Sequence, residues 1–277
     1  MKLRIGLSPC PNDTFVYHAL LHGKVDTPGV TWEPVMEDVE SLNERMLAGD
    51  LEVTKASFAA FAHARDLYAC ARTGGALGRG NGPLVVAKRA MDPYELGPLK
   101  VLLPGRLTTA ALLFHVFHPE VADAQFVRYD QLLEAVVNER ADAAVIIHEL
   151  RFTYREHGLH AVEDLGARWE KLTRLACPLG GAFVRRDVDP ALAMDIERWI
   201  GESLAYARAH PAASREFVRS HAQELTDGVT AKHIGLYVNE FSAGYGQQGE
   251  TAIRRLLLLA EKSGAGKASK KGIFVGE

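Results

Sequence analysis

Short apolar runs alternate with segments of helical pattern along the first sixty residues, and this alternation constrains the fold more than any other feature. The apolar runs lie at 3–7, 30–35 and 51–57, and helical patterns follow each of them. Such alternation is typical of βαβ units, in which helices cover a parallel sheet. The pattern predicts an α/β fold with a mostly parallel sheet.

The same alternation stops at a segment rich in proline and glycine and then begins again. A chain of 277 residues exceeds the usual size of a single core. From Cys177 onward the sequence has one strand-like run followed by long amphipathic helices. We therefore predict two lobes that meet at a cleft, with these boundaries: a larger lobe at 1–89 and 176–264, an inserted smaller lobe at 90–175, and a flexible, basic tail at 265–277.

Composition favours a small-molecule partner. The formal net charge is only -3 and 24% of the residues are charged, which gives no reason to expect binding to nucleic acid or to an anionic membrane. Pro9 and Pro11 interrupt the apolar start, so no signal peptide is expected, and the "LLLLA" run is too short to span a bilayer. The three cysteines form no CxxC pair. We expect a cytoplasmic protein with reduced thiols, and the sequence indicates no oligomeric state.

Three junctions between a predicted strand and a predicted helix carry polar residues. In an open α/β sheet, ligands bind beyond the carboxyl ends of the strands, where helix N-termini favour anions. These polar residues are Asn12, Asp13 and Thr14 at the first junction, Lys55 and Ser57 at the second, and Thr108 and Thr109 at the third. Taken singly, Ser57 and Thr109 are better explained as helix caps, and Lys55 as a solvated lysine. Their shared type of position predicts one binding site for an anion.

Other motifs give weaker signals. The glycine-rich segment 74–83 is followed by a strand rather than a helix, so it fits a connection between lobes better than a dinucleotide loop. His115 and His118 are close in sequence, but Pro119 ends their helix and further ligands are absent nearby. Cys10 has no histidine near it in sequence and is better explained as a packed thiol. We expect no metal and no cofactor.

His148 ends the apolar run of "ADAAVIIHEL". A histidine beside such a run is more often a hydrogen-bonded core residue than a catalytic group. It also stands beyond the last predicted strand of the smaller lobe, which is the position of the other candidate site residues. Both explanations stay open on this pattern alone.

Six motifs together resemble one known family, the 1,4-dihydroxy-6-naphthoate synthases of the futalosine route to menaquinone. In order they are "SPCPNDTF", "TKASF", "GALGRGNGPLVVAK", "LPGRLTTA", "IIHELRFTY" and "CPLGGAFVRRD". The resemblance implies a two-lobed fold like that of periplasmic binding proteins, with the active site in the interdomain cleft. It implies a lyase that converts cyclic de-hypoxanthine futalosine to 1,4-dihydroxy-6-naphthoate and releases dihydroxyacetone.

The resemblance also assigns roles by position. His148 would be the proton acceptor, and the substrate would be bound by Lys55, Ala56 and Ser57 from one lobe and by Thr109 and Ala110 from the other. A histidine suits the role because its pKa lies near working pH. Two alternatives are a chorismate dehydratase-like enzyme of the same pathway and a non-catalytic protein that binds small carboxylates. The "IIHE" histidine favours the naphthoate synthase.

Overall fold

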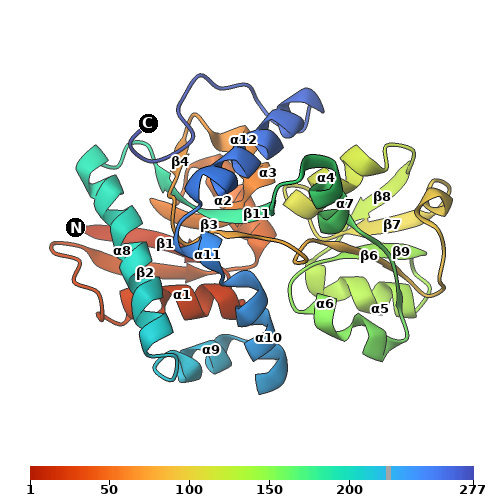
Figure 1. Cartoon of the computed structure of the whole chain (residues 1–277), viewed down its shortest axis with the longest axis horizontal. Coiled ribbons are helices and arrows are strands. Elements are labelled where there is room, and N and C mark those ends of the chain that lie inside the picture. The colour runs from red at the N-terminus through yellow and green to blue at the C-terminus, as the bar shows by residue number, and fades with distance from the viewer. Residues whose placement is uncertain (223–225) are drawn as a thin grey trace.

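Two separate β-sheets form the cores of two lobes that lie side by side (Figure 1). The computed structural model describes residues 1–222 and 226–277. Residues 223–225 fall within the range predicted for the larger lobe and lie outside the described residues. The predicted α/β class and two-lobed architecture are confirmed.

The larger lobe contains a six-stranded sheet. Five strands follow one another across it, in the order β2 (Thr31–Met36), β1 (Lys2–Leu7), β3 (Val53–Ser57), β11 (Cys177–Arg185) and β4 (Tyr68–Cys70), and β5 (Ala76–Gly78) pairs with β11. The β1 strand runs parallel to β2 and β3, whereas β11 is antiparallel to its neighbours. The predicted parallel pairing holds for the N-terminal strands, and the strand that returns from the second lobe makes the sheet mixed.

The smaller lobe contains a five-stranded sheet. Its order is β10 (His160–Asp164), β6 (Leu84–Ala87), β9 (Ala143–Ile146), β7 (Lys100–Leu103) and β8 (Asp123–Phe126). The β7 strand is parallel to β8 and β9, and β6 is antiparallel to β9 and β10. All strands of this sheet therefore come from one continuous stretch of chain.

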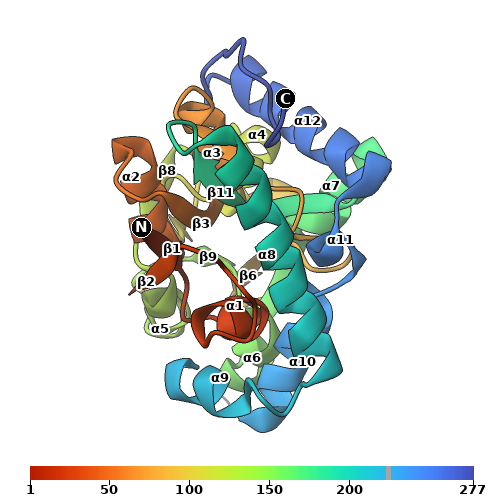
Figure 2. The same ribbon diagram turned by 90° about the vertical axis from the view of Figure 1, so that its left-hand side faces the viewer.

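Helices cover both sheets. The larger lobe has α1 (Pro11–Leu21), α2 (Val39–Ala48), α3 (Phe58–Ala64), α8 (Pro190–Ala209), α9 (Arg215–His221), α10 (Asp227–Tyr237), α11 (Glu240–Ala243) and α12 (Gly246–Lys262). The smaller lobe has α4 (Thr109–Phe117), α5 (Leu132–Val137), α6 (Leu150–Thr153) and α7 (Leu165–Thr173), and short 3-10 helices lie at Pro93–Leu96, Tyr129–Gln131 and Tyr154–His157. Helices α8, α9 and α10 pack on α1 (Figure 2), and α12 packs on α3. The C-terminal helices therefore complete the larger lobe.

Local sequence explains the ends of the predicted helices. The Asp38 carboxylate accepts hydrogen bonds from the backbone N–H groups of Glu40 and Ser41 and so begins α2, and Gly49 ends it in a left-handed conformation with φ of 68°. Asp189 caps α8 in the same way, with Pro190 in the first turn. No helix in the described part of the chain is long and apolar enough to cross a membrane.

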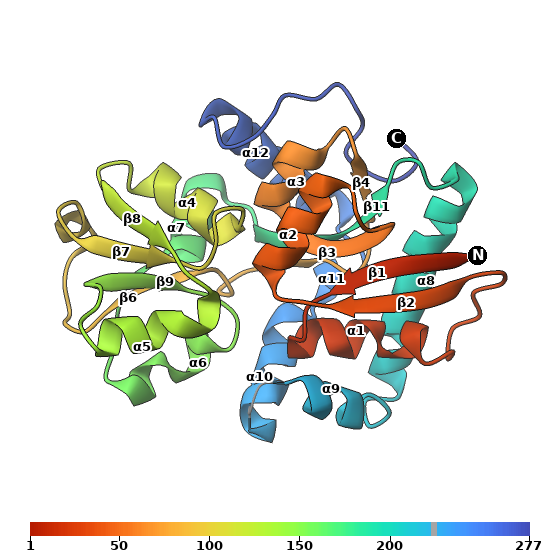
Figure 3. The same cartoon turned by 180° about the vertical axis from the view of Figure 1, so that it is seen from behind.

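The boundary between the lobes differs from the predicted one. Residues 84–87 were expected in the larger lobe, but Leu84 to Ala87 pair with β9 of the second sheet. The chain crosses between lobes at 79–83 and returns at 174–176 (Figure 3). The boundary between the lobes is therefore the glycine-rich segment. The apolar run after this segment pairs with an apolar strand of the second sheet, β9.

The C-terminal segment is ordered rather than a flexible tail. Phe274 is fully buried, and its backbone forms a bridge with Cys70 at the edge of the first sheet. The guanidinium groups of Arg72 and Arg254 lie 4.8 and 5.1 Å from the centre of its ring. The prediction of a tail rested on the basic composition of 265–277 and overlooked the short apolar motif "IFV" within it. Burial of this motif fixes the end of the chain.

Candidate functional site

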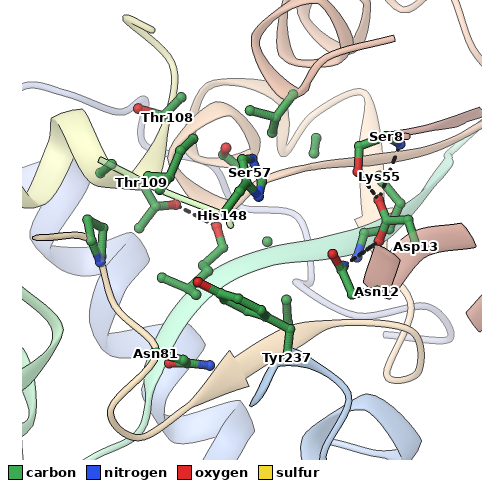
Figure 4. Close-up of a pocket in the computed structure, with 18 of the residues that line it drawn as sticks. Ser8, Asn12, Asp13, Lys55, Ser57, Asn81, Thr108, Thr109, His148 and Tyr237 are labelled. Carbon is green, nitrogen blue, oxygen red and sulfur yellow. Dashed lines mark hydrogen bonds and ion pairs between the residues drawn. The ribbon is translucent and has the colours of Figure 1, made fainter. Parts of the chain in front are cut away.

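A pocket of about 730 Å³, part of it open to solvent, lies between the two lobes. Thr14 of the first junction does not line it, because its side chain is buried and its hydroxyl donates to the Cys10 carbonyl oxygen at 3.0 Å. The other residues that the sequence and the resemblance singled out for the site do line it: Asn12, Asp13, Lys55, Ala56, Ser57, Thr108, Thr109, Ala110 and His148 (Figure 4). They converge because strands β1, β3, β7 and β9 all end at this pocket.

His148 follows the end of β9 in a tight turn before α6. Its backbone φ is 56°, a left-handed conformation that side chains other than glycine rarely adopt. The ring is partly buried, with Nδ1 3.6 Å from the Sγ atom of Cys10 and the Tyr129 ring at 5.3 Å between centroids. Burial lowers the pKa of His148, and the carboxylates of Glu149 and Asp13 oppose the shift. The imidazole is therefore neutral near pH 7 and can accept a proton.

Cys10 is the histidine's neighbour, although 138 residues separate the two in sequence. Burial raises the pKa of the Cys10 thiol well above its usual value. The thiol thus stays protonated and is a poor nucleophile, as the sequence analysis expected of a packed cysteine. The contact with a histidine was missed because it joins the segments that follow β1 and β9, which belong to different lobes.

Lys55 is buried and paired with an acidic side chain. It is therefore not a free, partly exposed cation that could bind an anion with its full charge. Its Nζ lies 3.2 Å from Asp13 Oδ1 and donates to the Gly74 carbonyl oxygen at 2.9 Å. Asp13 also accepts hydrogen bonds from the backbone and hydroxyl of Ser8 and from Asn12. The positive charge of Lys55 is shared with this carboxylate, so any ligand contact it makes is weakened.

The hydroxyl residues divide into three roles. Thr108 caps α4 by accepting from the Ala111 N–H, so the cap of this helix is Thr108 and not Thr109. Ser57 does not cap α3 with its side chain, and its hydroxyl accepts from Asn43 at 3.2 Å. The Thr109 hydroxyl joins the lobes, since it donates to the Leu179 carbonyl at 2.7 Å and accepts from a backbone N–H of α3 at 3.3 Å.

Sequence reasoning missed three further residues at the pocket. His233 of α10 contacts Asn12 Oδ1 through Nε2 at 3.0 Å and stacks on His148 with 6.4 Å between centroids. Burial lowers the pKa of His233 to about 3, so it is neutral. Tyr237 and Asn81 line the pocket itself. No local signal marks these residues, because they come from a C-terminal helix and from the segment between the lobes.

The two histidines considered for a metal lie away from the pocket. His118 is held by Glu163 Oε2 at 2.6 Å and by Glu120 Oε1 at 3.1 Å, and His115 is not part of that contact. Within residues 1–222 and 226–277, no group of three or more histidine, cysteine or acidic side chains is placed to hold a metal ion. His118 is accounted for by its two carboxylate partners.

This chain matches known proteins over almost its whole length. A family model described as menaquinone biosynthesis matches residues 3–262. This chain belongs to the menaquinone biosynthesis family. One relative, named 1,4-dihydroxy-6-naphtoate synthase, from Thermus thermophilus, is 47% identical over 99% of both chains. A second of the same name, from Streptomyces coelicolor, is 39% identical over 95% of this chain and 94% of its own.

Solved structures place this family member among two-lobed folds. Protein AF1704 from Archaeoglobus fulgidus matches with a TM-score of 0.88 and 33% identity, over 95% of this chain and 98% of its own. The periplasmic aliphatic sulphonate binding protein from Escherichia coli matches with a TM-score of 0.66 but only 13% identity, over 95% of this chain and 87% of its own. The second likeness concerns the fold alone.

These findings confirm the family assignment made from the six motifs. They also confirm, at the level of the family, the expected class of function, a lyase of menaquinone biosynthesis. The predicted fold of periplasmic binding proteins is confirmed as well.

Proposed function

We propose that this menaquinone-biosynthesis family member is a carbon–carbon lyase whose active site is the pocket between the lobes. Its substrate is cyclic de-hypoxanthine futalosine, and its products are 1,4-dihydroxy-6-naphthoate and dihydroxyacetone. The observation that carries the proposal is His148, a neutral histidine that faces a pocket lined from both lobes. The two relatives named for this synthase activity support the choice of reaction.

His148 acts as the general base in this proposal. Its Nδ1 points to Cys10, so the opposite nitrogen, Nε2, is the one left for the pocket, and no described residue bonds to it. In the tautomer whose proton is on Nδ1, the Nδ1–H group donates a hydrogen bond to the Cys10 sulfur. The Nε2 atom then has a free lone pair. It removes one proton from the substrate beside an activating carbonyl. The electron pair released drives bond cleavage, and the product becomes aromatic.

The substrate carboxylate binds at the beginning of α4. Thr109 and Ala110 form the start of this nine-residue helix and line the pocket. An N-terminus carries a partial positive charge and unpaired donors, which suits an anion. Lys55 and Asn12 contribute polar groups to the pocket, but Asp13 neutralises the Lys55 charge, so they add no second full positive charge.

Direct assay tests the reaction. Purified protein is incubated with cyclic de-hypoxanthine futalosine, and the naphthoate is followed by mass and ultraviolet absorbance, with chorismate as the control substrate. We expect naphthoate from the first substrate and no change in the second. Turnover of chorismate would instead identify a chorismate dehydratase-like enzyme, and binding without turnover would identify a carboxylate-binding protein.

The His148→Asn variant tests the role of the base. Asparagine tolerates the left-handed conformation and keeps a polar group, but it cannot accept the proton at working pH. General-base catalysis contributes about 10²–10⁴-fold, so kcat should fall by that range with the melting temperature nearly unchanged. A variant that keeps more than a tenth of the original kcat would show that His148 is structural.

The cytoplasm is the proposed location of this activity. Cys10, Cys70 and Cys177 are all buried and none forms a disulfide. Unpaired cysteines suit a reducing compartment. The proposed partner is the small carboxylate substrate.

A further inference from the structure

Asn81 lines the pocket with a side chain whose hydrogen-bonding capacity is unused. The residue is 1% exposed, and neither Oδ1 nor Nδ2 has a partner among the described residues. The Asp13 carboxylate and the Thr109 hydroxyl, which line the same pocket, both have hydrogen-bond partners. Leaving a buried carboxamide unpaired costs free energy, so such a group in a folded protein calls for a ligand or a bound water.

The segment that carries Asn81 is held firmly against the smaller lobe. The Gly80 N–H donates to Glu170 Oε1 at 2.8 Å. Gly82 packs so closely on Gly166 that an added Cβ would lie 2.3 Å from the Gly166 Cα. Arg151 donates to the Gly82 carbonyl and, at 2.7 Å, to Asp164. Contacts on both sides of Asn81 therefore fix its backbone beside the pocket before any ligand arrives.

The chemistry of a carboxamide restricts what it can bind. Nδ2 donates two hydrogen bonds and Oδ1 accepts two, so the best partner offers both an acceptor and a donor. A carboxylate offers acceptors only and would face the Oδ1 lone pairs. A hydroxyl group does both. In Figure 4, Asn81 lies on a part of the pocket wall away from Ser8, Asp13 and Lys55.

We propose that Asn81 binds the hydroxyl groups of the three-carbon part of the substrate that leaves as dihydroxyacetone. This inference rests on the proposed function, which supplies a substrate with a carboxylated ring and a hydroxylated fragment. Asn81 is thus a binding residue that selects for the fragment, and it does not take part in proton transfer.

Kinetics of the Asn81→Leu variant test the contact. Leucine has a similar volume and no hydrogen-bonding groups. We expect KM for cyclic de-hypoxanthine futalosine to rise roughly ten- to a hundredfold, because a contact of this kind binds ground state and transition state alike. The inhibition constant of 1,4-dihydroxy-6-naphthoate should stay the same, because this product lacks the fragment. Equal weakening of both ligands, or no change in either, would overturn the proposal.

Thermal unfolding of the ligand-free protein gives a readout that does not depend on activity. Asn81→Leu removes an unpaired buried group, so its melting temperature should equal or exceed that of the unsubstituted protein. Asn43→Leu is the matched control. Asn43 is also buried, but its side chain bonds Ser57 at 2.8 and 3.2 Å and its loss should lower the melting temperature.

The two tests separate the inference from the proposed function. A lower melting temperature for Asn81→Leu would mean that the carboxamide is structural, and it would overturn the role of Asn81 alone. An absence of turnover by the unsubstituted protein would overturn the proposed function, and with it the identity of the group that Asn81 binds.

Discussion

At the scale of single residues, His148 combines an unfavourable backbone conformation with a partly buried, neutral ring. A left-handed φ in a residue other than glycine costs on the order of 1 kcal/mol. The turn places the His148 ring between Cys10 and the pocket. Strain of this kind often accompanies functional groups.

The pH dependence of turnover should report this histidine. The active form is the neutral imidazole, so kcat/KM should fall as pH drops through the pKa of His148. Burial lowers that pKa from its usual 6.5, so the acid limb should lie below pH 6.5 and the rate should be level near pH 7. A pH–rate profile on the free enzyme measures it. An acid limb centred above pH 7 would contradict a base of lowered pKa.

Lys55 and Asp13 should stabilise the fold as a pair. Lys55→Met leaves the Asp13 carboxylate buried without its cation, and loss of one partner of a buried pair costs about 3–5 kcal/mol. Urea unfolding of Lys55→Met, Asp13→Asn and the double variant forms a mutant cycle. The double variant should be more stable than the sum of the single changes predicts. Additive losses would show that the two charges act independently.

At the scale of elements, the lobes are joined by contacts near the pocket. The Glu40 carboxylate of α2 accepts from the Leu107 N–H of the β7–α4 loop at 2.9 and 3.2 Å. Gly105 has a φ of 143°, and an added Cβ would lie 2.6 Å from Glu40. The close approach explains why a glycine stands there. Together with the Thr109 hydroxyl, this contact holds the lobes together.

Removal of the Glu40 contact should favour separation of the lobes. Glu40→Ala loses hydrogen bonds to a charged group, which are worth about 1.5–3 kcal/mol, or roughly tenfold or more in the ratio of open to closed molecules. We expect a larger radius of gyration by small-angle scattering without ligand, and a return toward the original value with product. Glu40→Gln keeps an acceptor oxygen and serves as the control. Identical scattering of all three proteins would exclude this role.

Individual elements were predictable from sequence because their signals are local. The strand before Ser57 and the helix that Thr108 caps follow from apolar runs and capping residues. Their convergence at one pocket followed from the general rule for strand ends. The contact of Cys10 with His148 and the arrival of His233 from α10 could not be predicted. Both depend on packing between segments far apart in the chain.

At the scale of the whole molecule, the smaller lobe is a continuous insertion. All five strands of its sheet lie between residues 84 and 164, whereas the sheet of the larger lobe is built from residues on both sides of that stretch. We expect a fragment of residues 82–176 to unfold cooperatively in urea, followed by far-ultraviolet circular dichroism. The matched fragment 1–83 should show no cooperative transition. A cooperative transition in 1–83 would contradict this division.

The position of β11 sets the order in which the lobes can fold while the chain is synthesised on the ribosome. This strand lies in the first sheet between β3 and β4, yet it is translated about a hundred residues after them. Until residue 185 has emerged, the N-terminal strands lack their neighbour and expose apolar faces, while the inserted lobe already has all its strands. The first part of the chain to be made is therefore the last to become native. We therefore expect residues 1–83 to be the stretch that most needs a chaperone during translation.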